Sequence, residues 1–247
     1  MEGNGAARVR LPILCLSVLM TAARLLLLTA CVAAGCGVDG RVEAEIEAAL
    51  PTALGPADSY EATVSGVSLR AGTLETVQVL GRRVAREDAP VIDRLDATLR
   101  DVAFDRGSRE LTRVGSTAAT ARLLPRDLAD YLSGQRGVGS AEVSLSAPDR
   151  VNVRVRGQIG EVTVPATATV EGRLTAQGGQ VLLDVERVSA LGISLGARVA
   201  RTVEAEVNPV ADFTDEDLEL RVESVSVDGS ALVVEMTGDL SGLRLRR

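Results

Sequence analysis

The feature that most constrains the fold is a regular alternation of apolar and polar residues between positions 161 and 188. From Val162 to Ala176 every second residue is apolar or small, and most residues between them are polar. A period of two is typical of a strand with one buried and one solvent-facing side. Residues 177–179 read Gln-Gly-Gly, which favours a tight reversal, and the alternation then resumes from position 180. The stretch therefore predicts a β-hairpin whose first strand has about 15 residues, against a usual 5–6.

The apolar side of this predicted strand carries unusually small residues. Ala166, Ala168 and Gly172 stand where the core of a β-sandwich usually has Ile, Leu or Phe. Two explanations are open at this point. Either a helix lies close against these positions, or an apolar ligand fills the space above them.

The rest of the chain has the same character. The pattern predicts helices over residues 38–54, 125–132 and 196–207, the first disrupted near its end by Pro51. It predicts a strand from 60 to 64, a bulge at Gly66, and a charged turn from 81 to 90. The other predicted strands cover residues 67–79, 95–104 with a phase change near Asp101, 117–123, 143–155 and 218–236 with a turn at 228–229. Together they predict an α+β fold, in which a long, highly curved antiparallel β-sheet wraps around one or two amphipathic helices.

Composition excludes several classes of function. The 247 residues include no His, no Trp and no Lys, so all 27 basic residues are arginine. Serine and cysteine nucleophiles therefore lack their usual bases, and the commonest metal ligand is absent. We expect no enzyme, no metal and no cofactor. A net charge of −7 and 2% aromatic residues also argue against binding to nucleic acid.

Two local patterns resemble sites, but another explanation fits each better. Glycines at 134, 137 and 139 follow a predicted helix and precede a strand, which is the reverse of a phosphate-binding loop. The acidic run between Asp212 and Glu219 lacks the glycine and the ligand spacing of a calcium loop. We interpret the first as a helix end with a loop and the second as a solvated surface.

Residues 1–36 read as a targeting segment. An arginine at position 24 interrupts two apolar runs, and translation from Met20 rather than Met1 would make that arginine the basic start of a signal sequence. Small residues precede Cys36, as in the lipidation signal of bacterial lipoproteins. The prediction is lipidation of Cys36 and an export route to the cell envelope, with anchoring at the outer face of the cytoplasmic membrane. A plain cleaved signal and a retained anchor stay open as alternatives.

Residues 37–247 are predicted to form a single domain, and three of its stretches resemble one protein family. These stretches are residues 69–79, 99–105 and 124–132, followed by a hairpin, a helix and a second hairpin up to the end of the chain. In pattern and order, residues 40 to 240 resemble the LmeA-like phospholipid-binding proteins of the bacterial cell envelope.

The resemblance implies a tubular lipid-binding domain that holds phospholipid acyl chains, or those of another acyl lipid, in an apolar groove between a curved sheet and a helix, without catalysis. The groove is expected to be lined by apolar residues of the first helix, the long hairpins and the last helix. These are Ile46, Leu50, Val153, Val155, Val164, Ala166, Ala168, Val170, Leu183, Val199 and Val203. Arg154 and Arg156 are weak candidates for a headgroup contact, and a solvated sheet face explains them better.

An alternative of a different class fits the same pattern. In it the protein is a lipid-anchored scaffold of the cell envelope, its core is full, and its sheet binds a partner protein. Mass spectrometry of co-purified lipid separates the two hypotheses, because only the lipid-binding domain would carry phospholipid.

Overall fold

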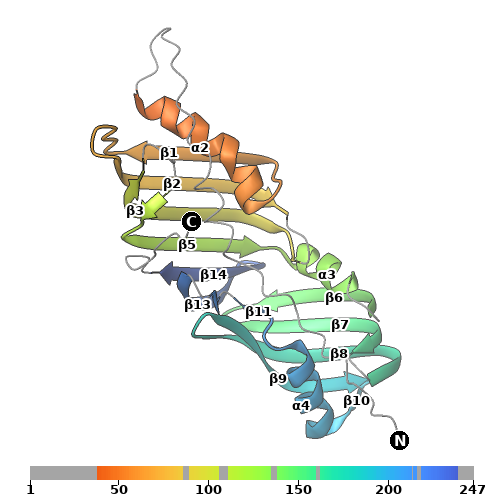
Figure 1. The fold of residues 1–247 in the computed structure, drawn as a ribbon. Coiled ribbons are helices and arrows are strands. Elements are labelled where there is room, and N and C mark those ends of the chain that lie inside the picture. The colour runs from red at the N-terminus through yellow and green to blue at the C-terminus, as the bar shows by residue number, and fades with distance from the viewer. Residues whose placement is uncertain are drawn as a thin grey trace, which may run out of the picture.

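A computed structural model describes residues 38–85, 89–105, 111–134, 138–159, 162–212, 214–215 and 218–238. Two antiparallel sheets lie side by side and form an elongated molecule (Figure 1). The first, sheet A, has the order β1-β2-β3-β5-β14-β13-β12, with β4 paired to β3. Its strands are β1 Ser59–Ser65, β2 Thr73–Val84, β3 Ile92–Phe104, β4 Leu111–Arg113, β5 Ser116–Leu123, β12 Thr214–Asp215, β13 Leu218–Asp228 and β14 Ala231–Gly238.

The second sheet, sheet B, contains the long hairpin that the alternation predicts. Its order is β10-β9-β8-β7-β6, with β11 paired to β9. The strands are β6 Val138–Ser146, β7 Arg150–Ile159, β8 Val162–Gln177, β9 Gln180–Ala190, β10 Ile193–Ser194 and β11 Ala211–Asp212. Strand β8 is 16 residues long and pairs with β9 around a turn in which Gly178 has a φ of +61°. The predicted hairpin is therefore confirmed.

Three helices accompany the sheets, and the α+β class is confirmed. Helix α2, Val38–Leu54, lies on sheet A, and helix α4, Gly196–Val207, lies on sheet B (Figure 1). Helix α3, Pro125–Ser133, begins two residues after strand β5 of sheet A ends at Leu123, and it leads into β6 of sheet B. Helix α2 continues through Pro51 to Leu54, so the proline does not end it.

Three local predictions can be compared with the backbone. Strand β1 ends at Ser65 and Gly66 begins the following turn with a φ of +64°, so the predicted bulge at Gly66 is wrong. The charged stretch 81–90 is only partly a turn, because β2 continues to Val84. The phase change near Asp101 is real: Asp101 has a φ of +52° within β3, which rotates the strand locally.

The buried hydrophobic residues form two clusters. The first lies between α2 and strands β1, β2 and β3, and it includes Val42, Leu50 and Phe104. The second joins α4, the β7–β9 part of sheet B and strands β5, β13 and β14 of sheet A. Because it draws residues from both sheets, this second cluster holds the two halves of the molecule together. A hydrogen bond from Val222 N–H to Gly178 O (2.9 Å) crosses the same junction.

Helix α2 is fixed to the exposed edge of sheet A by two carboxylates. Val64 N–H donates to Glu43 Oε1 at 3.0 Å, and Ala62 N–H donates to Glu47 Oε1 at 2.8 Å. Strand β1 is the first strand of sheet A, so these N–H groups have no strand partner on that side. Buried or half-buried backbone donors need an acceptor, and bonds to charged groups are the stronger ones. The two glutamates therefore close an open sheet edge and place the helix over the core.

An ion pair between Arg83 and Asp127 fixes α3 where the chain passes from sheet A to sheet B. Both oxygens of Asp127 accept hydrogen bonds from the guanidinium of Arg83, at 2.6 and 2.8 Å. Asp127 is only 4% exposed, whereas Arg83 lies at the end of β2 with a φ of +55°. Among the described residues, removing Arg83 would leave the buried Asp127 carboxylate with only the more distant guanidinium of Arg126, at 3.8 Å.

We expect Glu47→Ala to destabilise the fold by about 1.5–3 kcal/mol, because the Ala62 N–H would lose a charged acceptor. Urea unfolding of the two proteins measures this difference. Glu61→Ala is the matched control, since Glu61 is an exposed residue of the same strand β1, and its effect should stay within about 0.5 kcal/mol. Equal unfolding midpoints for Glu47→Ala and the control would show that α2 does not depend on this bond.

Candidate lipid-binding region

The cluster beneath α4 is aliphatic throughout its described members. Its buried residues are alanine, valine and leucine together with Met236, and none of them is aromatic. They come from six strands that lie in two sheets and from one helix. The buried residues are Ala121, Leu123, Val151, Val170, Leu174, Val181, Leu183, Val185, Val188, Ala200, Val203, Val222, Leu232, Val234 and Met236. Such a region can hold a hydrocarbon chain through burial alone, without directional contacts.

Helix α4 covers this aliphatic cluster with the side that the sequence predicts. Val203 is 2% exposed and Ala200 is buried, while Val199 and Val207 pack against the cluster from half-buried positions. These residues are three and four apart, so they share one face of the helix. Each is small, which leaves the helix close to strand β9.

The described hydrogen bonds between α4 and sheet B come from the C-terminal end of the helix. Val185 N–H donates to Glu204 Oε2 at 3.1 Å. Asn208, which follows the helix, accepts from Leu183 N–H at 2.7 Å and donates to Leu183 O at 2.8 Å. At the other end, the bond from Leu195 N–H to Val188 O (2.9 Å) lies ahead of the helix. Three side-chain hydrogen bonds thus hold the C-terminal end of α4 to β9, one backbone bond from the N-cap Leu195 holds its start, and apolar packing holds the helix between them.

The predicted groove residues fall into two separate places. Ile46 and Leu50 belong to the cluster beneath α2, whereas Val170, Leu183 and Val203 belong to the cluster beneath α4. Val153 and Val199 pack against the second cluster, and Val155 is buried on β7. The side chains of Val164 and Ala166 lie outside the described residues. The structure therefore brings together the residues of the long hairpins and α4, and it separates them from the two α2 residues.

The small residues of β8 have different explanations. An added Cβ at Gly172 would collide with the backbone carbonyl oxygen of Asp184, because a register shift at Gly172 brings β9 close. Gly172 is therefore small for a backbone reason that neither earlier explanation included. Ala168 is 0% exposed and pairs with Val155 of β7 and Ala190 of β9. Its surroundings are closed in this structure, so an acyl chain that reaches it must displace what covers it.

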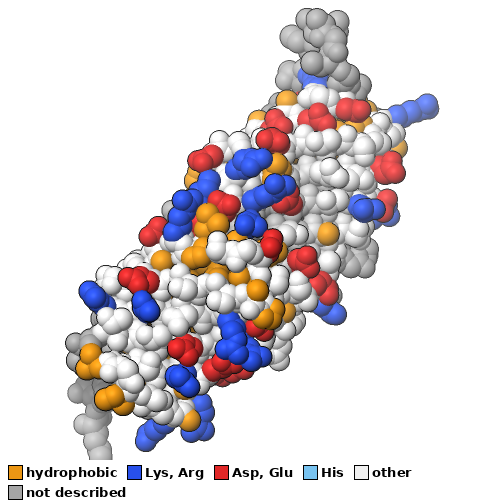
Figure 2. Space-filling view, turned by 180° about the vertical axis from the view of Figure 1, so that it is seen from behind, with side chains coloured by type: hydrophobic (Ala, Val, Ile, Leu, Met, Phe, Trp, Pro, Cys, Tyr) orange, Lys and Arg blue, Asp and Glu red, His pale blue; other side chains and the backbone are white. Residues whose placement is uncertain are grey.

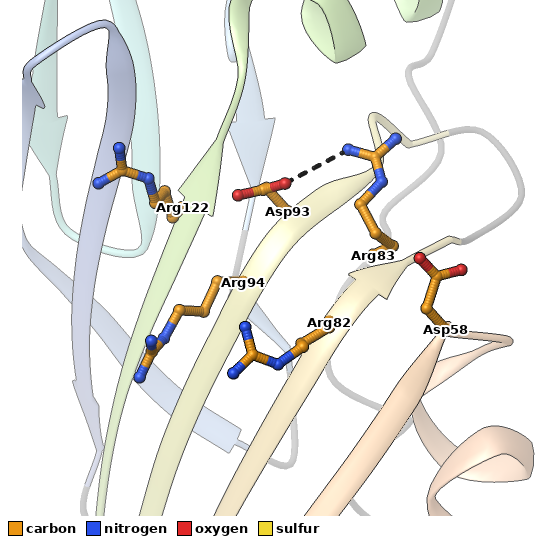
Figure 3. A pocket seen from close by; sticks show the side chains of 6 residues that line it. All are labelled: Asp58, Arg82, Arg83, Asp93, Arg94 and Arg122. Carbon is orange, nitrogen blue, oxygen red and sulfur yellow. Dashed lines mark ion pairs between the residues drawn. The ribbon is translucent and has the colours of Figure 1, made fainter.

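A polar pocket of about 390 Å³ opens elsewhere on the molecule. It is lined by four arginines and two aspartates, which Figure 3 shows as Asp58, Arg82, Arg83, Asp93, Arg94 and Arg122. Arg82, Arg94 and Arg122 lie directly opposite one another on β2, β3 and β5. Like charges in such positions repel each other. The sequence analysis missed this row, because only the strand register shows that the three residues are neighbours.

Aspartates offset most of this repulsion. Arg94 forms two hydrogen bonds with Asp96, at 2.7 and 2.9 Å, which raise the pKa of Arg94. The hydrogen bond to Asp127 raises the pKa of Arg83, and Asp93 lies 3.6 Å from the same guanidinium (Figure 3). Arg122 lies 3.7 Å from Asp228. Carboxylates thus lie close to Arg83, Arg94 and Arg122 and offset most of the positive charge of the pocket.

The comparison with known families settles the class of protein. A family model described as LmeA-like phospholipid-binding matches residues 33–237. The chain belongs to the LmeA-like phospholipid-binding family. The resemblance seen in the sequence is confirmed, and lipid binding is the function that the family indicates. Neither the curated proteins nor the solved structures contain a match to the chain.

For an LmeA-like protein the two candidate regions are not equivalent. The side chain of Arg122 is on the opposite face of β5 from Ala121 and Leu123, whose side chains enter the aliphatic cluster. A phospholipid whose headgroup lay in the polar pocket would need to pass its acyl chains through sheet A. The aliphatic cluster beneath α4 is therefore the better candidate, and the polar pocket is a charge network on the outer sheet face.

The remaining sequence candidates add little to this LmeA-like site. Arg156 donates to Thr167 Oγ1 at 3.0 Å, and Arg154 lies 3.9 Å from Glu142, so both belong to cross-strand contacts on the exposed face of sheet B. The acidic side chains between 212 and 219 lie outside the described residues, as does Cys36. Among described residues, no three His, Cys, Asp or Glu side chains are placed to hold a metal ion. None of the described helices has the length and apolar character needed to cross a membrane.

Proposed function

We propose that this LmeA-like protein is a non-catalytic phospholipid-binding protein of the cell envelope that holds acyl chains between α4 and the inner faces of the two sheets. The observation that carries the proposal is the aliphatic cluster, which joins both sheets and which α4 covers with its apolar side. The chemistry of such a region fits hydrocarbon and offers no polar group for a polar ligand.

The energetics of this mode of binding need no directional contacts. Each buried methylene group contributes about 0.8 kcal/mol, so even a part of one acyl chain offsets the cost of ordering it. Specificity for the headgroup would have to come from the rim of the region. Arg154 and Arg156 are engaged in contacts on the exposed face of sheet B, which leaves them poorly placed for that task.

Access for the lipid follows from the asymmetric attachment of α4. Residues 191–198 are all exposed, and the helix buries its apolar side only from Val199 onward. The hydrogen bonds of Glu204 and Asn208 fix the other end. On lipid entry the single bond from Leu195 N–H to Val188 O breaks, the N-terminal half of α4 swings outward about its C-terminal bonds, and an acyl chain replaces it over Val170 and Ala168.

Chemical composition supports binding without catalysis. The whole sequence lacks His and Lys, which removes the usual general bases and Schiff-base formers. Among the described residues the buried polar or charged side chains are Thr117 and Asp127, and Arg83 holds both oxygens of Asp127. Glu204 is the nearest carboxylate on α4, and a backbone N–H of β9 occupies it.

The cellular part of the proposal rests on residues 1–36. The apolar runs and the small residues ahead of Cys36 have the composition of a lipoprotein signal. Export and lipidation of Cys36 would place the lipid-binding region beside the outer face of the cytoplasmic membrane, where phospholipid is available to it.

The wild-type protein should carry phospholipid after purification, and Ala168→Phe should weaken binding of a fluorescent phospholipid by tenfold or more. Ala168 is fully buried and lies two residues from Val170 on the same face of β8, so the added ring occupies the path of the chain and overpacks the closed state by about 1–3 kcal/mol. Ala176→Phe is the matched control, because Ala176 lies on the same strand and at the same parity but is exposed.

Lipid extraction with mass spectrometry, thermal melting and the binding titration together decide this point. A folded Ala168→Phe protein that binds phospholipid as tightly as the control would place the acyl chains elsewhere. Purified wild-type protein that carries no phospholipid and binds none would favour the scaffold hypothesis instead.

The anchor makes a separate prediction. Protein isolated from the membrane fraction of the native host should begin at Cys36 and carry diacylglycerol on the thiol, as intact-mass and peptide spectra would show. Cys36→Ser should then move the protein out of the membrane fraction. An unmodified N-terminus a few residues after position 36 would reject lipidation and retain export.

A further inference from the structure

The large hydrophobic side chains that the described part of the chain exposes gather in one short segment. Leu191 is 78% exposed, Ile193 is 69% exposed and Leu195 is 37% exposed. They alternate within five residues at the turn from β9 through β10 into α4. We call residues 191–195 the apolar tip. Single exposed apolar residues are ordinary on a protein surface, but a contiguous group marks a contact with something else.

The backbone of the apolar tip adds to this observation. Ala190 pairs with Ile193, so Leu191 and Gly192 form a two-residue hairpin turn, with φ values of +51° and +77°. Such turns favour Asn-Gly or Asp-Gly, because both central residues have positive φ. Leucine is strained at this position and gains no burial there. A residue that is strained at its backbone position and gains no packing there indicates a functional role.

The charge around the apolar tip is positive in a chain whose net charge is −7. Residues 187–203 contain three arginines and no Asp or Glu. Arg187, Arg198 and Arg201 are exposed, and in the strand register Arg187 lies opposite Glu171 of β8. Helix α4 also starts here, with no acidic residue in its first turn and no side-chain cap. Figure 2 shows this end of the molecule at the lower left, where hydrophobic and basic side chains lie next to each other.

We propose that the apolar tip inserts into the interface of an anionic phospholipid bilayer, while Arg187, Arg198 and Arg201 contact its phosphate groups. Apolar side chains flanked by arginine are typical of segments that lie in a membrane interface. This inference rests on the proposed function and extends it: the segment that contacts the membrane leads directly into the N-terminal end of α4. Lipid would pass from the bilayer to the aliphatic cluster at this end.

The absence of tryptophan from the sequence allows a site-specific test. Ile193→Trp in the full chain puts a single indole at the apolar tip, and Ala71→Trp puts one in the exposed turn between β1 and β2, in the other half of the molecule (Figure 1). Both proteins are mixed with vesicles of phosphatidylglycerol and phosphatidylcholine in equal parts. The Ile193→Trp emission should shift to shorter wavelength and be quenched by brominated acyl chains, and the Ala71→Trp emission should not change. The full chain is used so that residues 1–36 contribute equally to both.

Two further changes separate membrane contact from folding, each made in the Ile193→Trp protein. Leu191→Asn should weaken vesicle binding by about tenfold and leave the melting temperature equal or higher, because asparagine suits a positive φ. Combined Arg198→Gln and Arg201→Gln should weaken binding to the same vesicles by about tenfold or more, and added salt should reduce the difference.

Several results would overturn the inference. One is an Ile193→Trp emission that vesicles leave unchanged, and another is an equal response of the Ala71→Trp control. A shift that appears without vesicles and grows with protein concentration would assign the apolar tip to a contact between two copies of the chain. If phospholipid still co-purifies with a protein whose apolar tip does not insert, the proposed function stands and only this inference fails.

Discussion

An antiparallel sheet with an open edge presents a row of backbone N–H groups that need acceptors, and this protein satisfies two such rows with side chains from helices. On β1, Glu43 and Glu47 of α2 accept from Val64 and Ala62. On β9, Glu204 and Asn208 at the end of α4 accept from Val185 and Leu183. In both cases the two acceptor side chains are four residues apart, in a helix or at its C-cap. The two N–H groups that donate to them are two residues apart on a strand. The two halves of the molecule thus use the same arrangement of hydrogen bonds. It blocks pairing of the sheet edge with another chain and fixes each helix over its sheet.

The position of the helices decides what the sheets can bury. Helix α2 closes one cluster, which contains Phe104 among its members. Helix α4 closes the other, which is aliphatic and joins both sheets. The bonds of α4 are concentrated at its C-terminal end, and its N-terminal half depends on small apolar residues such as Ala200 and Val199. The N-terminal half of such a helix can move away from the sheet while its C-terminal end stays bonded to β9. This difference between α2 and α4 is the physical basis for assigning lipid to the second cluster.

The sequence predicted those parts of the fold that depend on periodicity and failed where the register of distant segments matters. The hairpin from 161 to 188 and the apolar side of α4 follow directly from spacing, because burial enforces a period of two or of 3.6 residues. The sequence analysis did not identify the contacts of Glu43 and Glu47. Their spacing of four, repeated by Glu204 and Asn208, was the available signal for the edge contacts. Nothing in the sequence showed that Arg82, Arg94 and Arg122 would face one another, since that depends on pairing across three strands.

The candidate site was predictable in part for the same reason. Val170, Leu183 and Val203 share a cluster, as the pattern indicated, but Ile46 and Leu50 bury themselves beneath another helix. Gly172 is small because β9 approaches its backbone, a cause that appears only once the bulge is seen. The apolar tip was missed because Leu191 and Ile193 continue the alternation of the strand before them. Only their exposure separates them from core residues.

Hydrogen–deuterium exchange along α4, with and without bound phospholipid, tests the central claim most directly. We predict that amides of residues 199–203 exchange faster than those of 204–207 in lipid-free protein, because three side-chain hydrogen bonds hold the C-terminal end to β9 and only the Leu195 backbone bond holds the start. Phospholipid should change the exchange of the first group and leave α2 unaffected. Uniform exchange along α4, or a lipid effect confined to α2, would contradict the account.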